Sequence, residues 1–523
     1  MSTPAAYFRL LRAGWILLRE GVFAALPGHD LEGMPQRGWR VAQVLARRRA
    51  PGERSQRLIR AVERLGPSYV KLGQFLATRP DVVGSELALD LTELQDRMPT
   101  FPDAQSRLMI EGSLGRSVDA LFTRLEPPVA AASIAQVHPG EIIDPLGGRK
   151  VAVKVIRPGI RQRFYADLDS FFLAARLQER FIPSTRRLKP VEVAQTLAQT
   201  TKIEMDLRLE AAALSEIAEN TRNDPGFRVP AVDWERTGRD VLTLEWIDGV
   251  KLNNVPAIRA AGHDMEALAV TLIQSFLRHT LRDGFFHADM HPGNLFVEAD
   301  GTLVAVDFGI TGRLGKKERR FLAEILYGFI TRDYRRVAEV HFEAGYVPHR
   351  HDVASFAQAI RAIGEPIHGQ PAETISMGKL LTLLFEVTEL FDMQTRPELV
   401  MLQKTMVVVE GVARSLDPAF NMWRASEPVV SSWIRDNLGP RGLLSDAEDA
   451  AKAFVSLARQ APELAARTER LSAEIDKMAE NGMRFDIETA RAIGREEARH
   501  TRWGRAALWV GALALVWIAV QVS

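Results

Sequence analysis

The sequence contains no cysteine in its 523 residues. This absence excludes disulfides, thiol nucleophiles, cysteine-ligated zinc and iron–sulfur clusters together. The sequence also lacks a surplus of either charge: its formal net charge is +1, which argues against a dedicated nucleic-acid binder. Internal repeats, low-complexity linkers and a cleavable signal peptide are missing as well. What remains is an ordinary globular composition, 46% hydrophobic and 25% charged, in a length that suggests roughly two to four structural units.

Charge is absent from the last 18 residues, Ala506 to Ser523. At about 1.5 Å per residue, a helix over them would span roughly 27 Å, close to a ~30 Å hydrocarbon core. Four arginines come just before it, which places the body of the chain in the cytoplasm: Arg495, Arg499, Arg502 and Arg505. A buried core helix is the alternative. We predict a membrane anchor over residues 503–523.

Near the start of the chain, residues 7–26 form an amphipathic stretch. It either lies on a membrane surface or packs on a domain, and we favour packing.

Polar residues recur at fixed spacing between residues 285 and 309. Asp289 is followed by Asn294 and then by Asp307, which begins an Asp-Phe-Gly turn. The apolar runs 295–297 and 303–306, separated by a turn that contains glycine, predict a β-hairpin. Such a hairpin holds the asparagine just before its first strand and the second aspartate just after its second strand. Oxygen ligands at neighbouring positions suit a Mg²⁺ ion that bridges phosphates, and Asp289 then orients or deprotonates a nucleophile.

This stretch has two other interpretations. A buried turn with capping Asp and Asn residues explains any one of them, but not three at this spacing around a hairpin. His287 and His291 are at i and i+4, which suits a transition metal on a helix, but Pro292-Gly293 places them in a loop. We therefore expect His287 to brace the loop.

An earlier segment supplies the nucleotide-binding signal. Residues 125–143 end in a hairpin-like stretch, and residues 150–156 predict a strand that carries Lys154, like the strand lysine that pairs nucleotide phosphates in kinases. Where a kinase has a glycine-rich loop, this chain has Ala130, Ala131, Ala132 and Ser133. Alanine resists positive φ and carries a Cβ, so we expect ATP to be held more weakly or in a different pose, and phosphoryl transfer to be slow.

Residues 202–214 predict one helix, and its Glu210 is the candidate partner of Lys154. Glu204 and Asp206 are two further carboxylates ahead of it. Residues 241–247 predict a strand that ends in Trp246 and Ile247, where a lobe-connecting hinge would hold the adenine edge by its backbone.

A helix is predicted from Pro67 to about Arg79. Lys71 and Gln74 lie on one side of this helix, and Tyr69, Leu72 and Leu76 lie on the opposite side. An apolar stripe therefore packs while a Lys/Gln stripe faces something polar. An ordinary amphipathic helix gives the same pattern.

Taken together, the segments KLGQ, AAAS, VAVKV, EMDLRLE and HADMHPGN with DFG resemble the UbiB/ADCK family of atypical protein-kinase-like proteins over about residues 67–314. One departure is Met290, where the family usually has proline. The resemblance implies a bilobal kinase-like α+β fold in which Lys71 and Gln74 cover the active site and face the phosphates, Glu204 and Asp206. It also implies ATPase activity stimulated by membrane lipid, a role in ubiquinone biosynthesis, and residence in a bacterial inner membrane.

On this basis we expect six segments: residues 1–60 basic and helical, 61–124 the KxGQ helical extension, 125–248 an N-lobe, 249–440 a helical C-lobe, 441–502 a helical extension and 503–523 the anchor. The expected cofactors are ATP and Mg²⁺. The expected partners are membrane lipid, polyprenylated quinone precursors and other ubiquinone-biosynthesis proteins, and no nucleic acid.

The expected roles follow the kinase template: Lys154, Glu210 and Asp289 act in catalysis, and Asn294 and Asp307 bind the metal. The missing Ala-Pro-Glu element after Asp307 argues against peptide substrates. A lipid or small-molecule kinase and a non-catalytic nucleotide-binding scaffold remain alternatives. A ring hydroxylase is disfavoured, because the sequence lacks a flavin-binding Gly-x-Gly-x-x-Gly loop, cysteines and an iron triad.

Overall fold

The computed structural model describes residues 4–22, 54–77, 79–83, 98–144, 147–181, 188–369 and 397–439, with a few single positions between these ranges. The chain divides into two compact units, Met1–Arg435 and Asp436–Ser523. The predicted helical extension at 441–502 and the predicted membrane anchor at 503–523 lie outside the described residues. Among the helices that are described, none is both long and apolar enough to cross a bilayer.

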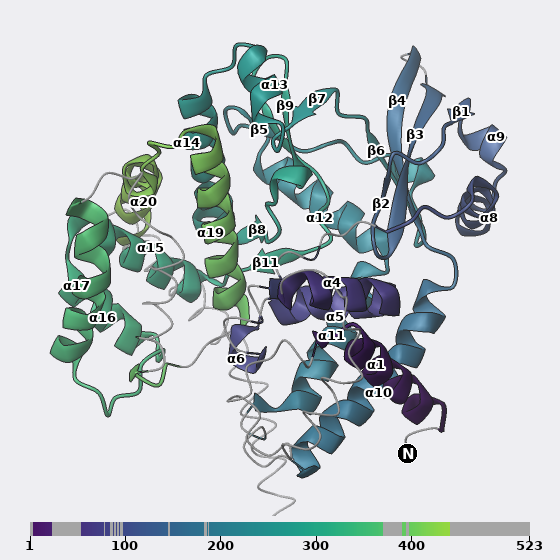
Figure 1. Cartoon of the computed structure of the whole chain (residues 1–523). Coiled ribbons are helices and arrows are strands. Elements are labelled where there is room, and N and C mark those ends of the chain that lie inside the picture. The colour runs from purple at the N-terminus through teal and green to yellow at the C-terminus, as the bar shows by residue number, and fades with distance from the viewer. Residues whose placement is uncertain are drawn as a thin grey trace, which may run out of the picture. The chain divides into compact units, whose positions relative to one another are not determined.

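A five-stranded sheet forms the N-terminal lobe (Figure 1). Its strands are β1 (Arg124–Leu125), β2 (Ala130–Ala131), β3 (Ala135–Asp144), β4 (Gly147–Ile156) and β6 (Val241–Glu245). β4 is antiparallel to β3 on one side and to β6 on the other, so the predicted strand at 150–156 is confirmed. Val151, Val153 and Val155 are fully buried on one face of β4. Because side chains alternate along a strand, Lys154 lies on the opposite face.

Two helices, not one, cover the region 190–220. α11 (Pro190–Glu204) ends before Met205, and α12 (Leu207–Asn220) begins after it. The prediction of one helix over 202–214 is therefore wrong. The physical reason is Asp206, whose side chain accepts a hydrogen bond from the backbone N–H of Arg208 at 3.3 Å and caps α12. The break puts Glu204 at the end of one helix and Glu210 in the first turn of the next.

Short strands in the C-terminal lobe carry the loops of the site. β5 (Phe227–Arg228), β10 (Leu303–Ala305), β9 (Leu295–Glu298) and β7 (Gly249–Lys251) form one sheet in that order, and β8 (Phe285–His287) pairs with β11 (Thr311–Arg313). In the β9–β10 hairpin Leu303 lies opposite Val297 and Ala305 lies opposite Leu295. The predicted hairpin is confirmed.

Helices make up the rest of this lobe: α13 (Val255–Ala260), α14 (Met265–Arg278), α15 (Lys316–Thr331), α16 (Tyr334–Glu343), α17 (Val353–Gly369), α19 (Pro397–Leu416) and α20 (Met422–Leu438). Side chains from α14, α19 and α20 share one apolar core with strands β8, β9 and β10. α15, α16 and α17 pack around a second core that includes Tyr334 and Phe356.

Helices before the kinase-like lobes pack on α10 (Ile160–Phe181) and α11. They are α1 (Pro4–Arg19), α4 (Arg54–Leu65) and α5 (Pro67–Ala77). α1 contacts α10 and α4, and α5 contacts α4, α10 and α11 (Figure 1). The predicted packing of the first helix is confirmed by buried Ala6, Ala13 and Ile16. Its other face exposes Tyr7, Phe8, Leu11 and Trp15.

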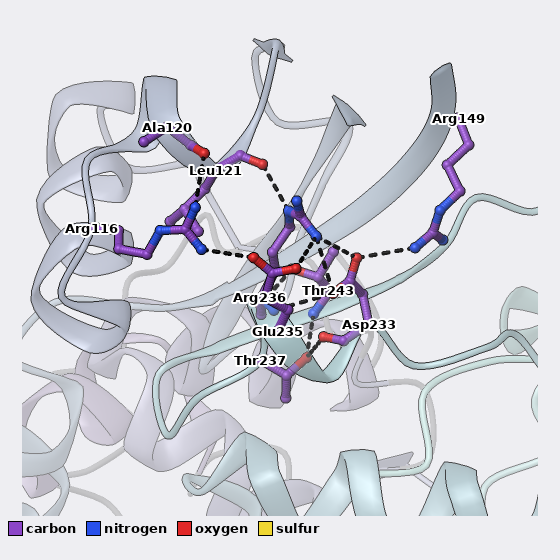
Figure 2. A network of polar contacts seen from close by, with 9 residues as sticks. All are labelled: Arg116, Ala120, Leu121, Arg149, Asp233, Glu235, Arg236, Thr237 and Thr243. Carbon is purple, nitrogen blue, oxygen red and sulfur yellow. Dashed lines mark hydrogen bonds and ion pairs between the residues drawn. The ribbon is translucent and has the colours of Figure 1, made fainter. Parts of the chain in front are cut away.

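A polar network fastens the loop before β6 to the outside of the N-terminal lobe (Figure 2). The loop contains the short helix η2 (Trp234–Arg236), and it meets α9 (Val118–Leu121). Arg236 donates from Nε to the Leu121 carbonyl at 2.7 Å and pairs with Asp233 at 3.1 Å. Arg149 on β4 also reaches Asp233, at 3.1 Å (Figure 2). These contacts position β6, whose end leads into the connection between the lobes.

Candidate functional site

Lys154 joins the two lobes by bridging two carboxylates. Its Nζ donates to both oxygens of Glu210 on α12, at 2.9 and 3.0 Å, and to Oδ1 of Asp307 after β10, at 2.8 Å. The predicted pair between Lys154 and Glu210 is confirmed, and the contact with Asp307 was not predicted. The lysine and glutamate side chains are 13% and 5% exposed, whereas Asp307 is 45% exposed. Asp307 is therefore the member of the cluster that can turn to a ligand.

The charges of this cluster depend on one another. Desolvation opposes the charge of Lys154, but the two carboxylates raise its pKa above the ordinary range of lysine. Desolvation also opposes ionisation of Asp307, yet the Lys154 ammonium lowers the pKa of Asp307 to about 2. Burial, assisted by the Asp307 carboxylate, raises the pKa of Glu210 to about 7 although Lys154 acts in the other direction. Near neutral pH Asp307 is thus firmly anionic.

The loop between β8 and β9 is braced by His287, as predicted. Its Nδ1 accepts from the backbone N–H of Asp289 at 3.1 Å, and its Nε2 lies 3.2 Å from the carbonyl of Val306. These two contacts are compatible with a neutral ring that carries its proton on Nε2. Burial lowers the pKa of His287, which favours that neutral form. The ring also packs on Phe308, with centroids 4.4 Å apart. His291 is exposed and accepts from Gly293 N–H, so it does not join His287 in a pair.

Asn294 and Asp307 lie at the two ends of the β9–β10 hairpin. The backbone N–H of Val306 donates to the carbonyl of Asn294 at 2.9 Å, so the two candidate ligands belong to adjoining backbone segments. The amide Nδ2 of Asn294 donates to the carbonyl of Asp289 at 3.1 Å and to its carboxylate at 3.4 Å. This leaves the amide oxygen as the group available to a cation. Asp307 has φ of +62°, a conformation rare outside glycine that functional sites retain.

These residues fit a Mg²⁺ site completed by phosphate oxygens. The donor set is one amide oxygen and one carboxylate that stays ionised, and Mg²⁺ prefers hard oxygen ligands. Among the described residues there is no group of three or more His, Asp or Glu side chains that could hold a metal by itself.

The alanine-rich segment forms the tip of the β2–β3 hairpin. Ala130 pairs with Val137 and Ala131 pairs with Gln136, and the Ala132 N–H closes the turn on the Ala135 carbonyl at 2.7 Å. Ser133 is fully buried inside this turn.

The connection between the lobes is residues 246–248, between β6 of one sheet and β7 of the other. The N–H of Trp246 donates to the carbonyl of Lys150 at 3.3 Å, so it is not free for an adenine edge. Ile247 is half-buried and remains the candidate donor from this segment.

Helix α5 places Lys71 at the site. Lys71 Nζ pairs with Glu204 at the end of α11, at 2.7 Å, and the two side chains are only 12% and 3% exposed. The Lys71 ammonium also lies close enough to Asp307 to lower that residue's pKa. Gln74 follows one turn later and is half-buried. On the opposite side Tyr69 packs edge-on against Phe171 of α10, with centroids 5.0 Å apart, so the predicted division of this helix is confirmed.

Asp206, predicted beside Glu204, has partners of its own. Besides capping α12, its carboxylate pairs with Arg208 at 2.7 Å. The Arg208 hydrogen bond lowers the pKa of Asp206. Of the two carboxylates expected beside Lys71, Glu204 pairs with it, and Asp206 pairs with Arg208.

One cation near the site was missed. Lys404 on α19 lies within electrostatic range of the Asp289 carboxylate and of the Lys71 ammonium. Its neighbour Thr405 donates to the carbonyl of Ala288 at 2.9 Å. A signal existed in the sequence, because Lys404 is the one charged residue in the run 399–409, which is apolar apart from Gln403, Lys404 and Thr405.

Comparison with known proteins agrees with this geometry. A family model described as the ABC1 atypical kinase-like domain matches residues 93–341, and one described as the UbiB helical domain matches residues 360–421. Three relatives carry the name "Probable protein kinase UbiB". The protein from Marinobacter nauticus is 39% identical over 461 residues, which cover 87% of this chain and 84% of the relative. The one from Aeromonas salmonicida is 39% identical over 474 residues, covering 90% and 86%.

The third relative, from Vibrio atlanticus, is 34% identical over 526 residues, covering 100% of this chain and 95% of its own. The Lys154–Glu210 pair lies inside the ABC1 match. With its kinase-like lobes, its KLGQ helix beside the site and relatives of this identity along most of its length, the chain belongs to the UbiB family of atypical kinase-like proteins.

Proposed function

We propose that the chain is a Mg²⁺-dependent ATPase of the atypical-kinase type that supports ubiquinone biosynthesis at a membrane. The observation that carries the enzymatic part is the bridge of Lys154 between Glu210 and Asp307. A lysine held in this way can exchange its contact with Asp307 for contacts with nucleotide phosphates. The biosynthetic part is supported by the UbiB name of the relatives.

Each residue has a defined task in this proposal. Lys154, oriented by Glu210, binds the α- and β-phosphates, and Asn294 and Asp307 would hold Mg²⁺. The metal supplies positive charge that neutralises phosphate oxygens. Asp289, fixed by its N–H to His287 and by Asn294, orients a water molecule and accepts its proton. The water oxygen bonds to the γ-phosphorus while the bond to the β-phosphate oxygen breaks, and ADP leaves with the electron pair.

Water, and not a peptide, is the acceptor that the covered cleft favours. α5 contacts α10 and α11, and its Lys71–Glu204 pair is nearly buried. A peptide would have to displace that pair, and separating a buried pair costs about 3–5 kcal/mol. We further propose that the apolar C-terminal segment anchors the body to the inner membrane, where the cycle acts on polyprenylated quinone precursors or on the proteins that modify them.

The test is phosphate release by the full chain, purified in detergent and mixed with ATP, Mg²⁺ and lipid vesicles. We expect turnover that depends on Mg²⁺ and that falls at least 100-fold in Asp307→Asn. Mass spectrometry of the same mixture, with quinone precursor added, distinguishes the alternatives. A phosphorylated organic product would replace the ATPase by a small-molecule or lipid kinase. Equal phosphate release by Asp307→Asn would refute the metal assignment, and quinone synthesis retained in Asp289→Asn cells would favour the scaffold.

A further inference from the structure

Helix α19 is hydrogen-bonded to the loop between β8 and β9, which carries Asp289. Thr405 is buried, and its hydroxyl lies 2.9 Å from the carbonyl of Ala288 and 2.8 Å from that of Met401 one turn earlier. Ala288 directly precedes Asp289. α19 also contacts β11, which pairs with β8 at the start of the same loop (Figure 1). The position of residue 404 relative to Asp289 is therefore set by the fold.

Lys404 is the charged side chain that this attachment brings to the site. Lys404 is half-buried. Its ammonium interacts electrostatically with the carboxylate of Asp289, on the loop between β8 and β9, and with the ammonium of Lys71 on α5. Within the part of the chain that the structure describes, Lys404 makes neither an ion pair nor a hydrogen bond through its ammonium. The neighbouring lysines are engaged: Lys154 with Glu210 and Asp307, and Lys71 with Glu204.

An ammonium removed from water without a partner is unfavourable, and burial accordingly lowers the pKa of Lys404. Asp289 opposes this shift, and Lys71 adds to it. A ligand that placed negative charge beside the Lys404 ammonium would offset the unfavourable free energy of burying it. In the kinase template the strand lysine serves the α- and β-phosphates, whereas the loop aspartate stands at the group being transferred. Lys404 lies within electrostatic range of the Asp289 carboxylate, and its helix is tied to the residue before Asp289 by Thr405.

We propose that Lys404 is a catalytic residue that contacts the terminal phosphate of ATP and balances the negative charge there during hydrolysis. The proposal rests on the ATPase function given above. Lys404 keeps its proton throughout: the water proton goes to Asp289, and the electron pair of the broken bond leaves with ADP. Because its ligand is the third phosphate, the residue distinguishes ATP from ADP.

The experiment compares two probes on the full chain with Mg²⁺: ADP and the non-hydrolysable ATP analogue adenylyl imidodiphosphate. In Lys404→Met we expect the dissociation constant of the analogue to rise at least 10-fold while that of ADP changes less than twofold. Lys404→Arg, which keeps the charge, should stay within about threefold for both. The matched control is Lys317→Met, which removes an exposed lysine at the start of α15. Under phosphate-release conditions Lys404→Met should lower kcat 10- to 100-fold.

A second measurement needs no substitution. Acylation of Lys404 in the wild-type chain, followed by mass spectrometry, should be slowed several-fold more by the analogue than by ADP. Equal protection by both nucleotides, or equal loss of affinity for both in Lys404→Met, would overturn the proposal. If the wild-type chain released no phosphate at all, the proposed ATPase function would be refuted. The two binding comparisons would still show whether Lys404 contacts the terminal phosphate of ATP.

Discussion

Arg228 offers a test of how the two lobes are held together. From β5 it donates to Glu298 on β9 at 2.8 and 2.7 Å, and to Glu245 at the end of β6 at 3.0 and 2.9 Å. Glu245 immediately precedes the inter-lobe connection at Trp246. One guanidinium thus ties the N-terminal sheet to the hairpin that carries Asn294. We predict that Arg228→Met destabilises the chain and lowers ATP turnover together.

The magnitude follows from exposure. Arg228 and Glu245 are each 34% exposed and Glu298 is 21% exposed. Exposed pairs contribute about 0.2–1 kcal/mol, whereas breaking a buried pair costs about 3–5 kcal/mol. Two bidentate pairs of intermediate exposure should therefore contribute about 2 kcal/mol to the free energy of unfolding. That loss changes the ratio of folded to unfolded protein about 30-fold.

Urea unfolding followed by tryptophan fluorescence measures this loss, with Arg222→Met as the control, because Arg222 is exposed near the end of α12. Desolvation opposes ionisation of Glu245, but Arg228 and the Ala231 N–H lower its pKa. The contribution of Glu245 to the free energy of unfolding is then present above the ordinary glutamate pKa of about 4.3. It is lost as the pH falls through the pKa of Glu245 in the folded state. The difference between wild type and Arg228→Met should shrink below about pH 4. A loss under 0.5 kcal/mol at pH 7, or one that Arg222→Met matches, would refute the reasoning.

Three further predictions concern single positions. Gly73→Ala places a methyl group 2.4 Å from Leu94 Cδ1, and the overpacking should lower the free energy of unfolding in urea by about 1–3 kcal/mol; an unchanged midpoint would show that Leu94 yields freely. Asp206→Ala removes the N-cap of α12 and should cost about 1 kcal/mol while phosphate release stays within twofold; a large fall in turnover would restore Asp206 to the site. Burial lowers the pKa of His138, so its contribution to stability is present above about pH 6.5 and lost as pH falls. Between pH 7 and 5 the wild type should lose more stability in urea than His138→Gln, and parallel losses would contradict the buried neutral imidazole.

Much of the site was predictable because its signals are local. The β9–β10 hairpin follows from two apolar runs and a glycine turn within fifteen residues, and it positions Asn294 and Asp307 by itself. The pairing of Lys154 with Glu210 spans 56 residues but follows from the resemblance to a known motif set.

The features that were not predicted have two causes. One is a side chain that competes for a backbone hydrogen bond, and the other is contact between residues far apart in the sequence. Residues 202–214 have helix-forming composition throughout, yet the side chain of Asp206 competes for a backbone N–H and ends one helix to start another. The contact of Lys154 with Asp307 joins residues 153 apart, and Thr405 reaches Ala288 over 117 residues. Such contacts depend on how whole lobes pack, which a pattern within one segment does not encode.

The central claim is that one divalent cation is held by Asn294 and Asp307 when nucleotide is bound. Titration of Mn²⁺ into the chain with saturating ADP, followed by the electron paramagnetic resonance signal of the free ion, measures this directly. The account predicts one nucleotide-dependent site whose affinity falls at least 10-fold in Asp307→Asn and is unchanged in Asp206→Asn. Cation binding of equal strength in wild type and Asp307→Asn would contradict it.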